Sequence, residues 1–234
     1  MKNILSILSI FLTITIAAQK PNHDQWTTLL NKHVSTAGKV NYKELKKEVS
    51  KLDDYIEDLK KNVPESEWSS NEKKAYWVNA YNAFTVKLIL TKYPLASIKD
   101  LNYDGKSAWD YKWIDIAGAK LSLNDIENKK LRSAFKDPRI HFVINCASYS
   151  CPVLINKAVK AENIDEILAS QTKKFLADKT RNKISADKVQ ISELFKWYAE
   201  DFGEMLDFLN KYGPTKIKAG TAIEYLEYKW NINE

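Results

Sequence analysis

The sequence predicts an α+β fold: a mostly helical single domain in which a buried central helix packs on a small, mostly antiparallel sheet. Helical periodicity dominates the chain, one long segment is apolar on nearly every side, and only short stretches alternate with the two-residue period of strands. No internal repeat and no linker rich in glycine or proline divides the chain. We therefore expect a single domain after the N-terminal segment.

Residues 1–18 have the layout of a secretory signal peptide. Lys2 is followed by an apolar run and then by two alanines before Gln19. We expect cleavage after Ala18 and one mature domain over residues 19–234, with its core at about 68–233. The mature chain would have no membrane span and would be exported to the periplasm or secreted.

The first part of the mature chain contains two predicted helices. Apolar side chains in residues 45–59 recur every three or four positions, which is typical of an amphipathic helix. Ser69 stands three residues before Glu72, as in a capping box, and no helix breaker follows until Pro94. This second segment is apolar nearly all round, so we expect it to be the buried central helix.

After Tyr111 the spacing of apolar residues changes from the helical period to the two-residue period of strands. Residues 111–123 predict two short strands about an Ala-Gly-Ala turn, and a helix capped by Ser122 or Asn124 should follow to Phe135. The apolar run 140–145 predicts a buried strand. The remaining predicted elements are a helix over 163–177, a hairpin over 182–192, two short helices broken near 201–203, and an aromatic C-terminal segment that returns to the sheet.

Four blocks of sequence, "AYWVNAYNAFTV", "IHFVINCASYSCPVL", "LFKWYAEDFG" and "YLEYKWNIN", occur in this order. Together they resemble the domain of unknown function 547 family of bacterial envelope proteins and plant proteins, over roughly residues 68–233. The resemblance implies no established activity. The residues that match the family motif are Asn79, Tyr81, Asn82, His141, Asn145, Cys146, Ser148, Ser150, Cys151, Pro152, Trp197, Asp201 and Phe202.

The basic character of the chain does not indicate a nucleic-acid partner. The net charge of +6 comes almost entirely from lysine, with arginine only at Arg132, Arg139 and Arg181. Arginine is the side chain that binds phosphate in a bidentate manner, so we expect no nucleic acid. The sequence has no glycine-rich phosphate loop or dinucleotide fingerprint, and its thiols and histidines lack zinc spacing. No cofactor and no metal are predicted.

Both cysteines, Cys146 and Cys151, fall in one short polar stretch, which allows three interpretations. In an exported protein, two cysteines and no others favour a disulfide that shapes the loop. Pro152 suggests instead that Cys151 begins a helix, where the helix dipole would activate the thiol and His141 would act as its base. A reversible redox pair is the third interpretation.

The polar residues around the cysteines also have two interpretations each. Asn79 and Asn82 are three residues apart and share one helix face, so they either pin loop backbone to the helix or orient a histidine. On a strand, His141 and Asn145 would share a face about 13 Å apart, too far to touch. The partner of His141 must then come from elsewhere, from Asp201 or an asparagine, unless His141 is a buried histidine bound to a carbonyl group.

Two hypotheses of function follow. The preferred one is a non-catalytic binding or scaffold module for an unidentified envelope ligand or protein, with a loop stiffened by a Cys146–Cys151 disulfide. Its binding residues would be Asn145, Ser148, Ser150 and Tyr81.

The alternative hypothesis is an enzyme similar to cysteine hydrolases or acyl-transferases. Its nucleophile would be Cys151 or Cys146, and His141 would move the proton. Asn79 or Asn82 would orient the imidazole ring.

Overall fold

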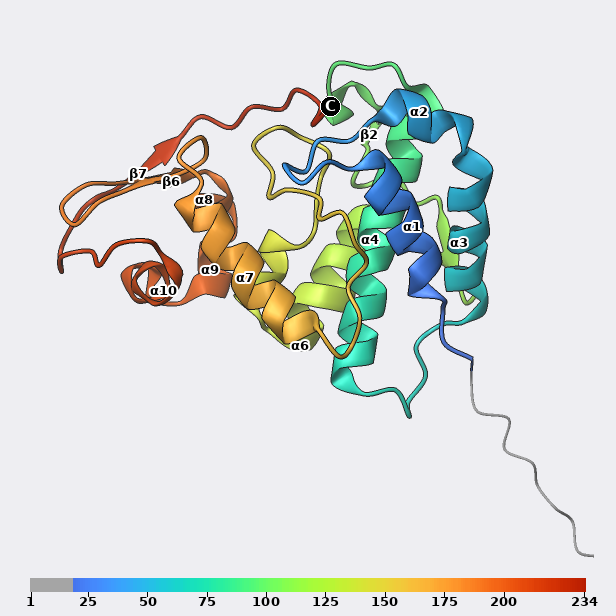
Figure 1. The fold of residues 1–234 in the computed structure, drawn as a ribbon, viewed down its shortest axis with the longest axis horizontal. Helices are drawn as coiled ribbons and strands as arrows, with labels where there is room; N and C mark the ends of the chain where they lie inside the picture. Colours follow the sequence, from blue (N-terminus) through green and yellow to red (C-terminus); the bar gives the residue numbers. More distant parts are fainter. Residues whose placement is uncertain (1–18) are drawn as a thin grey trace, which may run out of the picture.

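The structure is a computed structural model that describes residues 19–234, and the predicted signal peptide lies outside the described residues. The fold is α+β and mostly helical, as the sequence predicts (Figure 1). The α-helices are α1 (His23–His33), α2 (Tyr42–Lys47), α3 (Val49–Lys61), α4 (Ser70–Lys92), α5 (Leu123–Asp125), α6 (Ser133–Phe135), α7 (Ile164–Ala177), α8 (Leu194–Trp197), α9 (Ala199–Phe202) and α10 (Met205–Tyr212). A π-helix, η2 (Ile126–Arg132), joins α5 to α6, and η1 (Ile98–Asp100) and η3 (Pro138–Phe142) are 3-10 helices.

The described strands form three small sheets. The two-stranded sheets pair β1 (Asn102–Tyr103) with β2 (Lys106–Ser107) and β3 (Ile114–Ile116) with β4 (Ala119–Leu121). The third sheet has the order β5 (Lys183–Ile184), β6 (Val189–Ser192), β7 (Ile223–Leu226). All pairs are antiparallel except β6 with β7, which is parallel. The two predicted hairpins, β3–β4 and β5–β6, are therefore confirmed.

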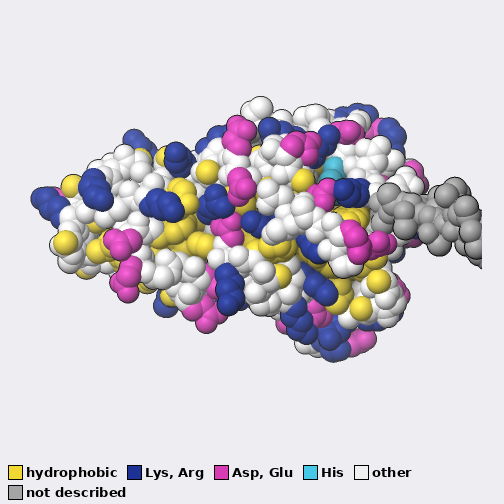
Figure 2. All heavy atoms as spheres, turned by 90° about the horizontal axis from the view of Figure 1, so that it is seen from below, with side chains coloured by type: hydrophobic (Ala, Val, Ile, Leu, Met, Phe, Trp, Pro, Cys, Tyr) yellow, Lys and Arg dark blue, Asp and Glu magenta, His cyan; other side chains and the backbone are white. Residues whose placement is uncertain are grey.

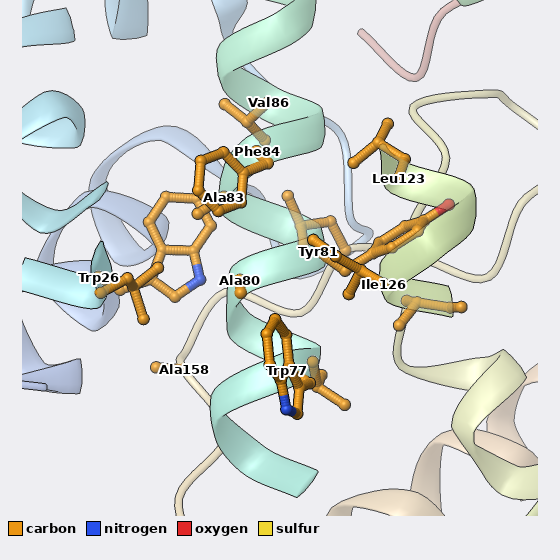
Figure 3. Close-up of a cluster of buried hydrophobic side chains, with 14 of the residues drawn as sticks. Trp26, Trp77, Ala80, Tyr81, Ala83, Phe84, Val86, Leu123, Ile126 and Ala158 are labelled. Carbon is orange, nitrogen blue, oxygen red and sulfur yellow. The ribbon is translucent and has the colours of Figure 1, made fainter. Parts of the chain in front are cut away.

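The predicted central helix is α4. Ser69 and Glu72 form the predicted capping box, and the helix is buried along most of its length. Tyr81 points from α4 toward the helix that begins at Leu123, whereas Trp26 of α1 packs on the opposite side of α4 (Figure 3). Burial of each large apolar side chain contributes about 1.5–3 kcal/mol, so α4 is the main support of the fold.

The buried apolar side chains form two clusters, which are joined along α7 and at the segment that follows η3. The larger cluster surrounds α1 to α4, and the smaller one lies among α7, β6 and α8 to α10 (Figure 1). Phe142 belongs to the smaller cluster, while its neighbours Val143 and Ile144 belong to the larger one. The chain next to the predicted reactive loop thus joins the two cores.

The predicted strand over residues 140–145 is wrong. Residues up to Phe142 belong to η3, where Asp137 accepts a hydrogen bond from the Arg139 amide and Pro138 occupies the first turn. A short apolar run is compatible with either a buried helix or a buried strand. Here the cap and the proline at the start of the helix decide the conformation.

The C-terminal part also differs in detail from the prediction. Three short helices, α8 to α10, replace the predicted two, and α9 is followed directly by Gly203, whose φ is +60°. Strand β7 joins the sheet, but the chain after it leaves the sheet and runs back toward the larger cluster (Figure 1). There Asn231 forms a β-bridge with Ser97, and Ile232 forms one with Ser148.

The surface carries both signs of charge. On the face seen in Figure 2, lysine and arginine side chains are interspersed with aspartate and glutamate. Within residues 19–234, no helix has the length and hydropathy that a membrane crossing requires.

Candidate active site

A cavity of about 300 Å³ lies where the two hydrophobic clusters meet. Its polar lining includes one histidine and both thiols of the chain, and six of its residues are aromatic. The lining residues are Tyr81, Ser107, Trp109, Asp110, Asn124, Glu127, His141, Ile144, Cys146, Cys151, Leu194, Trp197, Tyr198, Tyr228 and Trp230. The structure thus brings the predicted imidazole and both predicted sulfur atoms to one pocket.

The loop that carries Cys146 is held in an unusual conformation. Ala147 has φ +61°, in the left-handed region that residues other than glycine seldom adopt. The Asn145 side chain braces this turn: Oδ1 accepts a hydrogen bond from the Ala147 amide at 2.9 Å, and Nδ2 donates to the Pro152 carbonyl at 2.8 Å. Because these bonds compensate for the backbone strain, the loop presents Cys146 in a fixed orientation.

Cys146 is the partly exposed thiol of the pair, and two hydroxyl groups lie within hydrogen-bond distance of its sulfur. The Ser148 hydroxyl lies 3.1 Å and the Tyr228 hydroxyl 3.4 Å from Sγ. The pKa of Cys146 is lowered to about 7. The largest contribution is the hydrogen bond with the Cys151 thiol, and the bonds with Ser148 and Tyr228 add to it, so that together they outweigh the effect of burial. A substantial fraction of Cys146 is therefore thiolate at neutral pH, and the thiolate is the nucleophilic form.

Cys151 has the opposite character. It is buried, and its Sγ accepts a hydrogen bond from the Cys146 amide at 3.0 Å. Burial, and then the adjacent Cys146, raise the pKa of the Cys151 thiol well above its usual value. The predicted helix after Pro152 is absent, so no helix dipole acts on Cys151. Cys146, rather than the Cys151 preferred from sequence, is the thiol suited to react.

The predicted Cys146–Cys151 disulfide is wrong, because both thiols are free. The two cysteines are neighbours, but they interact through an amide-to-sulfur hydrogen bond. Hydrogen bonds of Asn145 give the loop the rigidity that the disulfide was expected to supply.

His141 is held by a carboxylate and not by an asparagine. Its Nε2 lies 2.7 Å from Oδ2 of Asp201, on α9, and its ring packs on Tyr198 with ring centres 4.1 Å apart. Arg132 binds the same carboxylate through Nε at 2.6 Å and Nη2 at 3.0 Å. Burial favours the neutral acid, but hydrogen bonds from His141 and Arg132 outweigh it and hold the pKa of Asp201 far below its usual value.

The permanently charged Asp201 fixes the orientation of the imidazole ring. Because Nε2 of His141 is engaged with this carboxylate, Nδ1 is the nitrogen that remains to exchange a proton in the pocket. Of the two kinds of partner suggested from sequence for His141, the structure shows Asp201 and not an asparagine.

The two asparagines instead pin loop backbone to α4. Asn79 donates to the Val159 carbonyl at 2.7 Å and accepts from the Val159 amide at 3.0 Å. Asn82 donates to the Val143 carbonyl at 2.9 Å and accepts from the Asn145 amide at 2.8 Å. Asn82 therefore contributes to the site indirectly, by fixing the segment between His141 and Cys146.

Of the four predicted binding residues, two lie at the pocket or at the Cys146 sulfur and two do not. Tyr81 lines the pocket, and Ser148 contacts the Cys146 sulfur. Asn145 and Ser150 lie outside the lining; Ser150 Oγ accepts a hydrogen bond from the Lys229 amide at 2.9 Å, so it fastens the C-terminal segment.

Sequence reasoning missed an acid in the pocket. Glu127 lies on the π-helix η2 and is only 4% exposed, yet it lines the cavity. π-Helical segments are frequent at functional sites, but residues 122–135 show the pattern of an ordinary helix. Tyr198, which packs on His141, and Tyr228, which contacts Cys146, were also missed, because nothing in their local sequence places them at the pocket.

The fold and the pocket define an α+β protein with a thiol and a carboxylate-bound histidine in one cleft. Residues 65–176 match the family described as "Protein of unknown function, DUF547", and the chain carries a domain of this family, as its sequence motifs predict. His141, Cys146 and Glu127 lie inside the matched region, whereas Asp201 and Tyr228 lie beyond it. No curated protein and no solved structure matches the chain.

Proposed function

We propose that the protein is an enzyme of the cysteine-hydrolase or acyl-transfer class, with Cys146 as its nucleophile. The observation that carries the proposal is the environment of the Cys146 sulfur: it opens on a pocket, its pKa is lowered to about 7, and a histidine held by Asp201 borders the same pocket. A thiolate with a positioned imidazole and a third group that orients the ring is the arrangement that activates a cysteine nucleophile.

In the proposed reaction, the Cys146 thiolate attacks the carbonyl carbon of an amide or ester and forms a C–S bond. The imidazole of His141, protonated on Nδ1, then donates its proton to the leaving nitrogen or oxygen as the C–N or C–O bond breaks. A water molecule, or an acceptor alcohol or amine, gives its proton to His141 and attacks the thioester. This step releases the acyl product and regenerates the thiolate. The Tyr228 hydroxyl, near the sulfur, is suited to stabilise the oxyanion.

The alternative is the non-catalytic binding module. The sequence-based version of this hypothesis depended on a loop stiffened by a Cys146–Cys151 disulfide, but both thiols are free. A purely structural pocket would also not require a thiol of lowered pKa. The enzyme hypothesis accounts for both features, so we favour it.

We further propose, on the pattern of residues 1–18, that the protein is exported and acts on a component of the cell envelope.

Alkylation with iodoacetamide tests the proposed nucleophile. The rate at Cys146, followed by mass spectrometry of peptides, should rise with pH with a midpoint near 7, whereas Cys151 should react only in unfolded protein. Cys146→Ser should abolish labelling of the folded chain, and Cys151→Ser should preserve it. A midpoint at the ordinary thiol value of about 8.5 would contradict the proposal.

A second measurement addresses turnover. A panel of chromogenic esters and amides should show a burst of product that equals the enzyme concentration, followed by slower release. Cys146→Ser and His141→Gln should each lower the rate by about a thousandfold or more. Equal turnover by the Cys146→Ser variant would rule out the thiol mechanism.

A further inference from the structure

The pocket around Cys146 is acidic in a chain that is basic. The whole chain has a net charge of +6, yet the pocket lining contains two acidic side chains, Asp110 and Glu127, and a single basic one, the imidazole of His141. Lysine and arginine are absent from the lining in the part of the chain that the structure describes. A cleft lined by one sign of charge concentrates the opposite charge within it.

Glu127 is the buried acid of the pocket. It is 4% exposed, the Tyr198 hydroxyl hydrogen-bonds to it, and two of the basic side chains that follow it on η2 form their own ion pairs with other acids. Lys129 pairs with Asp125 at 2.7 Å, and Arg132 pairs with Asp201 and Glu200. No salt bridge joins Glu127 to these side chains in residues 19–234, and the charge of Arg132 is shared with Asp201 and Glu200. A cationic ligand in the pocket would therefore offset the cost of burying the Glu127 carboxylate.

The second carboxylate is oriented by the protein. Asp110 is exposed, its Oδ2 accepts a hydrogen bond from the Ser107 hydroxyl at 2.6 Å, and its Oδ1 accepts one from Asn124 at 2.7 Å. Because all three residues line the cavity, Asp110 places a fixed negative charge at its open side. One acid thus lies deep in the pocket and one at its mouth.

Aromatic rings provide the rest of the wall. Trp197 and Trp230 stack with ring centres 5.6 Å apart, and Trp109 meets Trp230 edge to face at 5.6 Å. Trp197 is 45% exposed, which is unusual for a tryptophan and places an open ring at the pocket. The Lys99 ammonium lies 5.2 Å from the centre of the Trp230 ring, so this aromatic group already attracts one cation.

We propose that this pocket binds a primary ammonium group on a short chain, such as a lysine side chain or a free peptide amino terminus, between Glu127 and the tryptophan wall. The volume of about 300 Å³ suits a ligand of this size. The inference rests on the proposed function: the acyl substrate or acceptor of Cys146 would carry the ammonium group near its reacting bond. A cation-binding pocket next to a thiolate would select amine-bearing substrates over neutral and acidic ones.

Protection of Cys146 from alkylation tests this inference without a substrate. n-Butylammonium chloride should slow the reaction of the purified chain with uncharged iodoacetamide, while 1-butanol and sodium butyrate at the same concentration and ionic strength should have little effect. Calorimetric titration with n-butylammonium should give a dissociation constant that weakens about tenfold in Glu127→Gln, because a charge-assisted contact is lost. Glu57→Gln, at an exposed position on α3, is the matched control and should bind as the unaltered chain does.

The outcomes separate the two proposals. Equal protection by 1-butanol and n-butylammonium would show an apolar pocket and overturn the cation proposal, even if Cys146 remains reactive. If Cys146 proves unreactive but calorimetry still detects n-butylammonium and not 1-butanol, the proposed enzyme is wrong and the cation site stands. If Glu127→Gln fails to fold by circular dichroism, the comparison of ligands on the unaltered chain and on Asp110→Asn decides the question.

Discussion

At the scale of single residues, the difference between the two cysteines comes from their neighbours. At Cys146, hydrogen bonds from the Cys151 thiol first, and then from Ser148 and Tyr228, outweigh burial and favour the thiolate. At Cys151, burial and the adjacent Cys146 outweigh the Cys146 amide and the Tyr228 hydroxyl, so the neutral thiol is favoured. Tyr228 lies 82 positions from Cys146, so the sequence around the cysteines could not show which of them is activated.

Tyr228→Phe tests this explanation. Removal of the hydroxyl takes away one donor that favours the charged form of Cys146, so the pKa of Cys146 should rise by roughly one unit. The midpoint of alkylation against pH should move upward by the same amount, and the rate at pH 7 should fall. Tyr225→Phe, on the exposed face of β7, is the control and should leave the midpoint unchanged. An unchanged midpoint in Tyr228→Phe would show that other groups set the thiol pKa.

At the scale of elements, α4 fixes the site through side chains that bind backbone. Asn82 satisfies the Val143 carbonyl and the Asn145 amide, both of which are buried and outside regular structure. Buried backbone groups need such partners. This role explains why asparagine is tolerated in the middle of α4, where the helix is buried on nearly every side.

Asn82→Leu should therefore lower the free energy of unfolding by about 2–5 kcal/mol, since it leaves two buried backbone groups without partners. Urea denaturation followed by circular dichroism measures the change. Asn71→Leu, a half-buried position in the first turn of the same helix, should change stability by no more than about 0.5 kcal/mol. Loss of turnover without loss of stability in Asn82→Leu would instead support the orienting role considered from sequence.

Some of these elements could be predicted from the sequence, and others could not. Ser69 with Glu72 predicted the start of α4, and the Ala-Gly-Ala turn predicted β3–β4, because both signals are local. The strand predicted over residues 140–145 is wrong because a short apolar run does not distinguish a buried helical turn from a strand. The π-helical turn that carries Glu127 into the pocket also has no sequence signature, so the position of this acid could not be predicted.

At the scale of the whole molecule, the C-terminal segment joins the N-terminal helices to the reactive loop. After β7 the chain crosses back to the larger cluster, where the Asn233 carbonyl accepts from the Val40 amide and the Asn233 amide donates to the Ala147 carbonyl (Figure 1). Its side chain accepts from the Tyr42 hydroxyl at 2.8 Å and donates to Asn145 at 3.1 Å. Stability of the whole fold and geometry of the Cys146 loop should therefore be coupled.

Asn233→Ala tests this coupling, because it leaves the fully buried Tyr42 hydroxyl without its acceptor and removes one support of Asn145. We expect the free energy of unfolding to fall by about 2 kcal/mol. Because Asn145 holds the turn at Ala147, the alkylation midpoint of Cys146 should also rise. Asn231→Ala is the control: its side chain is exposed and its backbone bonds are retained, so neither quantity should change. A loss of stability with an unaltered midpoint would show that the C-terminal segment supports the fold but not the reactive loop.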